Sequence, residues 1–124
     1  MHFSLVMAAV LAVVLAAAHS YLGERYILMR LFRRTDLPEL FGGAEFTKQT
    51  LRFAWHITSI AWLGLASLIV VLASSPGEAH LAQARIIAGV FGISGVAALV
   101  GSRGRHLSWV VFLAIAALVW FSYP

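Results

Sequence analysis

Residues 53–73 have the sequence FAWHITSIAWLGLASLIVVLA and contain no aspartate, glutamate, lysine or arginine. A helix of about 20 apolar residues crosses the roughly 30 Å hydrocarbon core of a lipid bilayer. The polar interruptions of this run are His56, Thr58, Ser59 and Ser67. The stretch therefore predicts a transmembrane helix.

The overall composition also favours a membrane protein. Of the 124 residues, 61% are hydrophobic and 11% are charged, whereas soluble globular proteins average about 45–50% and about 25%. A soluble domain of this length has too little interior to bury so much apolar surface. The chain has no cysteine, which excludes disulfides, thiolate metal sites and cysteine nucleophiles.

Three further apolar runs of suitable length flank this stretch, at residues 3–23, 81–101 and 107–123. The connections at 74–77 and 101–105 are short, polar and contain glycine and serine, a composition typical of turns. Short connections place successive helices side by side in opposite directions. We therefore expect an all-α integral membrane protein, a single domain over residues 1–124, with four antiparallel transmembrane helices in an up-down bundle.

The predicted loop at residues 24–52 has features of its own. Its first part alternates apolar residues with four arginines: Arg25, Arg30, Arg33 and Arg34. This pattern is typical of a helix end at the membrane interface, with guanidinium groups that reach the phosphates of anionic lipids. Asp36 and Glu39 have the spacing of a capping box, which predicts a short interfacial helix ended by the glycines at 42–43.

The distribution of basic residues predicts the orientation of the helices. The first and third loops hold most of the lysines and arginines: Arg25, Arg30, Arg33, Arg34, Lys48, Arg52, Arg103 and Arg105. Only Arg85 lies near the opposite side. Because short cytoplasmic loops are enriched in lysine and arginine, we expect both termini outside and a location in the bacterial inner membrane. The net charge of +4 thus indicates membrane topology rather than nucleic-acid binding.

The first apolar run has an alternative interpretation as a cleaved secretory signal. The small residues at 16–18 would suit a signal peptidase. Against this, the segment begins without a lysine or arginine, its apolar run is long, and an arginine-rich segment follows. We therefore expect the first helix to be retained, whereas cleavage after residue 18 would leave three helices.

Three histidines share the depth of the predicted cytoplasmic interface. His19 lies near the end of the first helix, His56 near the start of the second, and His106 at the start of the fourth. Glu24 follows at the end of the first helix. Polar residues inside a membrane are costly and usually face other helices, so a compact bundle would bring the three imidazoles and this carboxylate together.

Several functions suit such a cluster. As ligands, the three histidines and Glu24 would fit a divalent metal such as zinc or iron. Two of the histidines, on different helices, could instead supply the axial ligands of a b-type haem. Imidazole and carboxylate groups would also suit proton-linked transport. No helix has an HxxxH or ExxH spacing, so ordinary hydrogen bonding at the interface stays open as well.

The second helix also carries a polar stripe. His56, Ser59 and Ser67 follow one another at helical spacing and share one face. We expect this face to turn inward, towards other helices or a water-filled pocket.

The third helix has small residues along much of its surface, including Gly89, Gly92 and Gly95. Small residues allow helices to approach closely in lipid. The helix is therefore expected to lie at the centre of the bundle, or to bind a second copy or another membrane protein. Because the chain has no catalytic motif, we expect a non-enzymatic component that packs with itself or with a larger complex. The alternative is a metal- or haem-binding protein, or a small proton-linked transporter.

Overall fold

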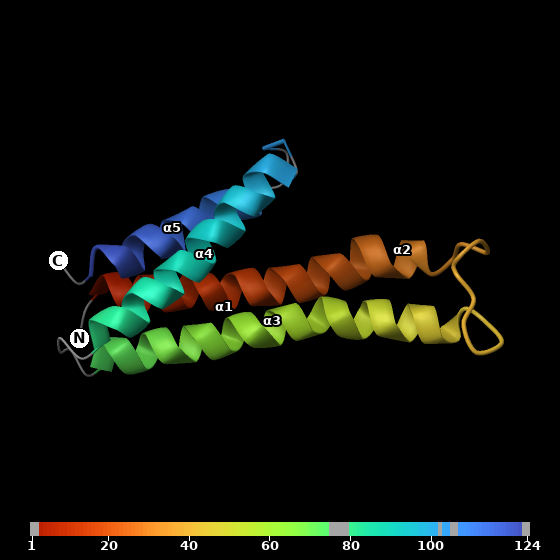
Figure 1. The fold of residues 1–124 in the computed structure, drawn as a ribbon, viewed down its shortest axis with the longest axis horizontal. Helices are drawn as coiled ribbons and strands as arrows, with labels where there is room; N and C mark the ends of the chain where they lie inside the picture. The colour runs from red at the N-terminus through yellow and green to blue at the C-terminus, as the bar shows by residue number, and fades with distance from the viewer. Residues whose placement is uncertain (1–2, 75–79, 102, 105–106, 123–124) are drawn as a thin grey trace.

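The computed structural model describes residues 3–74, 80–101, 103–104 and 107–122. Its elements are α1 (Phe3–Gly23), η1 (Glu24–Leu28), α2 (Met29–Leu31), α3 (Glu45–Ser74), α4 (Leu81–Gly101) and α5 (Ser108–Trp120) (Figure 1). The first three elements form one continuous helix. Within the described residues no β-strand is present, and the predicted all-α class is confirmed.

Three helical segments are long and apolar enough to cross a membrane: Phe3–Leu31, Glu45–Ser74 and Leu81–Val100. α5 is strongly apolar but has only 13 residues, which corresponds to roughly 20 Å at about 1.5 Å per residue. By length and composition, the described chain therefore offers three spans and one shorter apolar helix.

The four helices α1, α3, α4 and α5 form two antiparallel pairs that cross each other (Figure 1). α1 and α3 lie side by side, and α4 packs along α5. The second pair approaches the first near the N-terminus of α1, and α5 makes most of the contact with α1. α3 and α4 follow each other in the chain but contact each other little. The expectation that they pack as neighbours is therefore corrected, because α3 packs on α1 and α4 on α5.

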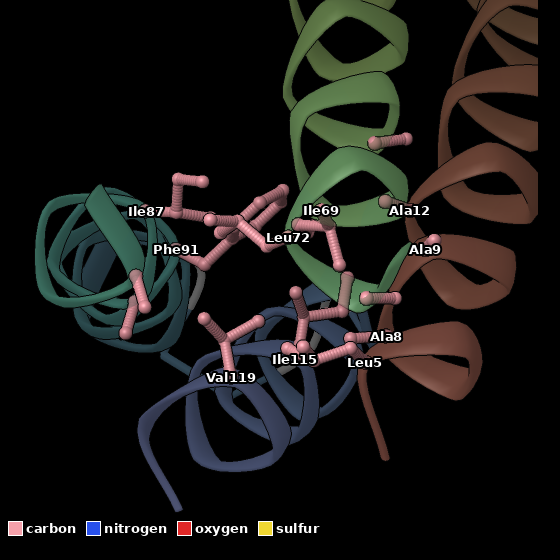
Figure 2. Close-up of a cluster of buried hydrophobic side chains, with 14 of the residues drawn as sticks. Leu5, Ala8, Ala9, Ala12, Ile69, Leu72, Ile87, Phe91, Ile115 and Val119 are labelled. Atoms are coloured by element: carbon pink, nitrogen blue, oxygen red, sulfur yellow. The ribbon is translucent and has the colours of Figure 1, made fainter. Parts of the chain in front are cut away.

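The hydrophobic core lies where the two pairs cross (Figure 2). Its fully buried members come from α1, α3, α4 and α5: Leu5, Ala8, Ala12, Ile69, Phe91, Ile115 and Val119. The buried alanines of α1 recur every four residues at Ala8, Ala12 and Ala16. Their small side chains allow α3 and α5 to approach α1 closely, which is how helices gain packing energy in lipid.

The predicted loop at 24–52 is mostly helical, which corrects the expected boundaries. The first helix continues beyond Gly23 as far as Leu31, and α3 begins at Glu45 rather than at residue 53. Hydropathy detects the part of a helix that fits the bilayer. Arginine, glutamate and lysine are good helix formers, so they prolong both helices beyond that apolar part.

The short helix predicted from Asp36 is not formed in the connection at residues 32–44, all of which the structure describes. Arg34 donates two hydrogen bonds to the Asp36 carboxylate, one of them 2.8 Å long from Nε. These bonds hold the pKa of Asp36 below its usual range and occupy the oxygens that would cap a helix. Residues 32–44 instead form turns, with Phe41 and Gly42 at positive φ.

Candidate functional site

The candidate site begins where the first helix becomes π-helical. In η1 (Glu24–Leu28) the backbone N–H of Met29 donates to the carbonyl of Glu24, five residues earlier. A single π-turn inside an α-helix shifts the side chains beyond it around the axis, and such turns are frequent at functional sites. The turn lies at the basic end, defined here as the end of the α1–α3 pair that carries Arg25, Arg30 and Arg52.

Glu24 joins this turn to α3. Oε2 of its carboxylate accepts a 3.2 Å hydrogen bond from Nε of Arg52, and its Oε1 forms an ion pair with Nη2 of the same arginine over 2.8 Å. Nε2 of His56 lies 3.1 Å from the same Oε2 atom. Charge-assisted contacts between arginine and a carboxylate are among the strong side-chain pairings. Glu24 is therefore held by a permanent cation on one side and by an imidazole on the other.

The network continues from His56 deeper between the two helices. Nδ1 of His56 lies 2.9 Å from Oγ of Ser20, and Ser20 donates a 2.8 Å hydrogen bond to Oγ of Ser59. Ser59 is buried, whereas Arg52 is half exposed. A chain of hydrogen bonds thus runs along the α1–α3 seam from the surface of the basic end into the protein.

The available donors determine the proton count of this chain. Because Ser20 donates to Ser59, its oxygen accepts from Nδ1 of His56, which then carries a hydrogen. Nε2 faces an oxygen of Glu24, and an ionised carboxylate only accepts. A hydrogen bond between the two groups therefore requires one further proton, either on the imidazole or on the carboxyl group. In this arrangement of donors, His56 and Glu24 would share one proton.

His19 occupies the other side of the seam. Its ring stacks on the indole of Trp55, with centroids 4.6 Å apart and an interplanar angle of 5°. The ring of Trp62 meets the His19 ring edge-on, at an interplanar angle of 67° and a centroid distance of 4.8 Å. The indole N–H of Trp55 donates to the backbone carbonyl of His19 over 3.0 Å. Gly23 leaves the space that the Trp55 indole fills, since a Cβ there would lie 2.0 Å from its Nε1.

A cavity of about 690 Å³ opens beside these rings, between the α1–α3 pair and the start of α5. His19, Trp55 and Trp62 form part of its wall, and Phe112 contributes from α5. Small-molecule sites commonly measure about 300–1,000 Å³. The seam thus has a hydrogen-bonded face and a cavity face, built from neighbouring residues of the same two helices.

The structure brings together part of the predicted cluster. Glu24 and His56 are in direct contact, whereas His19 lies against the two tryptophans. His106 lies outside the described residues. Among the residues that the structure describes, no group of three or more His, Asp or Glu side chains could hold a metal ion. The metal set, which includes His106, and the haem ligands, two of the same three histidines, stay predictions.

The polar stripe of α3 divides into two parts. Ser59 is buried and joined to Ser20 as expected. Ser67 is exposed, and its hydroxyl donates to the backbone carbonyl of Leu63 over 2.9 Å. The expectation that Ser67 faces inward is therefore wrong. A serine satisfied by its own helix can face lipid at little cost, which a stripe in the sequence does not reveal.

Sequence reasoning missed several members of the site: Ser20, Gly23, Arg52 and Trp55. Ser20 and Glu24 are four residues apart, as are Arg52 and His56. Side chains at this spacing lie on one face of a helix, so each pair was available as a signal. What the spacing does not show is that the two faces meet.

Comparison with known protein families, with curated proteins and with solved structures finds no match for this chain. The function is therefore inferred from the site geometry and its chemistry.

Proposed function

We propose that this chain is a four-span protein of the bacterial inner membrane, with its termini outside and its basic end in the cytoplasm. Arg25, Arg30, Arg33 and Arg34 are all exposed at that end, where the positive-inside rule favours them and anionic lipid phosphates can bind them. The fourth span would combine α5 with the apolar residues that flank it, Leu107 and Phe121, both of which are exposed.

We propose further that the protein is a proton-linked binding or transport component rather than an enzyme. The observation that carries this proposal is the 3.1 Å contact between His56 and Glu24, at the end of a hydrogen-bonded chain that reaches the buried Ser59. Ionisable residues within membrane helices are expensive to retain and commonly form proton relays.

Arg52 gives the pair two distinct states. With the proton on His56, the ionised carboxylate of Glu24 lies between two cations, the imidazolium and the guanidinium. With the proton on Glu24, the ion pair with Arg52 loses its negative charge. Transfer of one proton therefore alters the contact between η1 and α3, and a π-turn is a place where a helix can change register.

The experiment compares His56→Gln with the wild-type protein in liposomes that contain a pH-sensitive dye. Glutamine can hydrogen-bond to its neighbours but cannot carry the proton. After an external pH step, we expect wild-type liposomes to change internal pH faster than empty ones. His56→Gln should lower the rate to that of empty liposomes. Ser67→Ala is the matched control on α3, and it should behave as wild type because Ser67 bonds its own helix. A wild-type rate in His56→Gln would disprove the proposal.

A second candidate function, self-association or packing with a larger membrane complex, rests on the outward face of α4. This face has a shallow apolar concavity of about 630 Å³, lined by Gly89, Gly92, Ile93, Val96, Ala97 and Val100. A Cβ added at Gly89 would meet no atom within 4 Å. Gly95 differs, because a Cβ there would lie 2.8 Å from Leu113 of α5. The small residues of α4 therefore have two roles. Gly95 allows α5 to pack closely, whereas Gly89 lies on the open outward face.

This second candidate predicts different results for two glycines of α4. Gly89→Leu should fill the open concavity and reduce the dimer fraction, while the melting temperature in detergent stays within a few degrees of wild type. Gly95→Leu should lower the melting temperature by disturbing the α4–α5 contact. The dimer fraction is measured by energy transfer between labelled copies in liposomes. Gly64→Leu is the control, since Gly64 on α3 is equally open. An unchanged dimer fraction in Gly89→Leu would remove this candidate.

A further inference from the structure

The cavity beside His19 has a buried inner wall and an exposed rim. Leu15 and Phe112 on its inner wall are buried, at 9% and 5% exposure. Its rim includes Tyr26 and Leu107, which are 54% and 75% exposed. The cavity lies where the α4–α5 pair diverges from the α1–α3 pair towards the basic end (Figure 1). If the helices span a bilayer, an apolar molecule could therefore enter it laterally from the lipid.

Flat rings form one side of the cavity. His19, Trp55 and Trp62 contact one another there, and Trp62 also meets Phe112 with ring centroids 5.1 Å apart. Trp55 is held further by its hydrogen bond to the His19 carbonyl. Rings packed in this way lose little entropy on binding and favour a planar aromatic or quinonoid partner.

The polar groups of the wall are few and carry no permanent charge. Among the described residues that line the cavity there is no lysine, arginine, aspartate or glutamate. The polar side chains besides the indoles and Tyr26 are His19, Thr58 and Ser108. An anionic head group in an apolar cavity needs a cation or several donors. The wall therefore favours a neutral head group that forms hydrogen bonds over a phospholipid phosphate.

We propose that this cavity binds a neutral, membrane-soluble amphiphile with a flat, oxygen-bearing ring and an apolar tail, which is the chemistry of a membrane quinone. The ring lies against His19, Trp55 and Trp62, and the tail leaves past the exposed rim into lipid. A volume of about 690 Å³ accommodates such a ring and the first part of a tail. The inference rests on the membrane location proposed above, but not on the shared proton of His56 and Glu24.

The test measures binding of decylubiquinone to detergent-purified full-length protein by quenching of tryptophan fluorescence. Ala18 lines the cavity, so Ala18→Phe should fill it and weaken saturable quenching by about tenfold or more. Ala17 is exposed and does not line the cavity, and Ala17→Phe should bind as wild type. The matched pair separates binding in the cavity from partition of the quinone into the micelle.

A second pair on α5 keeps the test decisive if Ala18→Phe does not fold. Val111 lines the cavity, whereas its neighbour Val110 does not. Val111→Phe should weaken binding and Val110→Phe should not. Equal binding in Val111→Phe and wild type would overturn the proposal. Displacement of the quinone by phosphatidylglycerol, with the same dependence on Val111, would overturn it in favour of a phospholipid site.

A failure of quinone binding can be distinguished from a failure of the proton-linked function. His56 lies on the hydrogen-bonded face of the seam and does not line the cavity. His56→Gln should therefore bind decylubiquinone as tightly as wild type, even where it stops proton movement. Loss of quinone binding in His56→Gln would contradict the separation of the two faces.

Discussion

Gly23→Ala is expected to destabilise the protein by about 1–3 kcal/mol, the usual cost of forcing an extra carbon into a packed contact. The new Cβ would lie 2.0 Å from Nε1 and 2.3 Å from Cε2 of Trp55. The indole cannot move away freely, because it donates a hydrogen bond to the His19 carbonyl and stacks on the His19 ring. Either α1 and α3 separate or Trp55 leaves its place.

Thermal unfolding in detergent measures this effect, with Gly64→Ala as the control. Gly64 also lies within a helix, but a Cβ there meets no atom within 4 Å. Because alanine favours a helix over glycine by about 1 kcal/mol, Gly64→Ala should be neutral or slightly stabilising. The emission of Trp55 should shift in Gly23→Ala alone. If both variants melt at the same temperature, Trp55 does not pack against Gly23 in solution.

Glu24→Ala is expected to cost about 1–2 kcal/mol, since hydrogen bonds to charged groups contribute about 1.5–3 kcal/mol and this carboxylate is partly screened by water. Its side chain is 30% exposed, and it contacts both Arg52 and His56. Removing it leaves a guanidinium and an imidazole facing each other between α1 and α3. The first helix would also lose the contact that holds its π-turn against α3.

Glu45→Ala is the matched control for this prediction. Glu45 pairs with Lys48 at 3.6 Å, but its side chain is 78% exposed. A surface pair of this kind contributes about 0–1 kcal/mol. The two variants are compared by thermal unfolding, and Arg52→Ala is added to complete a double-mutant cycle with Glu24. A coupling energy near zero between Glu24 and Arg52 would show that the pair does not stabilise the fold.

The substitutions Gly23→Ala and Glu24→Ala change opposite faces of the α1–α3 seam. Gly23 and Trp55 support the cavity face, whereas Glu24 and Arg52 belong to the hydrogen-bonded face. Gly23→Ala should therefore weaken decylubiquinone binding in protein that remains folded, and Glu24→Ala should leave it unchanged. The adjacent positions of Gly23 and Glu24 in the chain make this a sensitive test, because one helix presents both faces.

The all-helical class and the three long apolar segments could be predicted from the sequence. The charge-free run at 53–73 requires a helix in lipid, because an unpaired backbone group there costs several kcal/mol. Periodicity also placed His56 and Ser59 on one face of their helix, where the structure has them. These properties depend on short segments, so a local pattern is enough to determine them.

Helix ends were less predictable for a physical reason. Arg25 and Arg30 look like loop residues by hydropathy, yet they continue the first helix through η1 and α2. Charge decides whether a residue favours water, but it does not decide whether its backbone is helical. Asp36 likewise has the right spacing to cap a helix and instead binds Arg34.

The sequence by itself determined that the apolar runs are helical and on which of these helices each of their polar groups lies. Only the tertiary structure decided that Glu24 meets His56 and Arg52, that His19 turns to Trp55, and that α4 packs on α5 rather than on α3. The angle between two helices depends on the shapes of both surfaces, such as the gap at Gly23 that receives an indole. Such complementarity depends on residues that are far apart in the chain. The periodicity of one helix gives no information about the surface of the other.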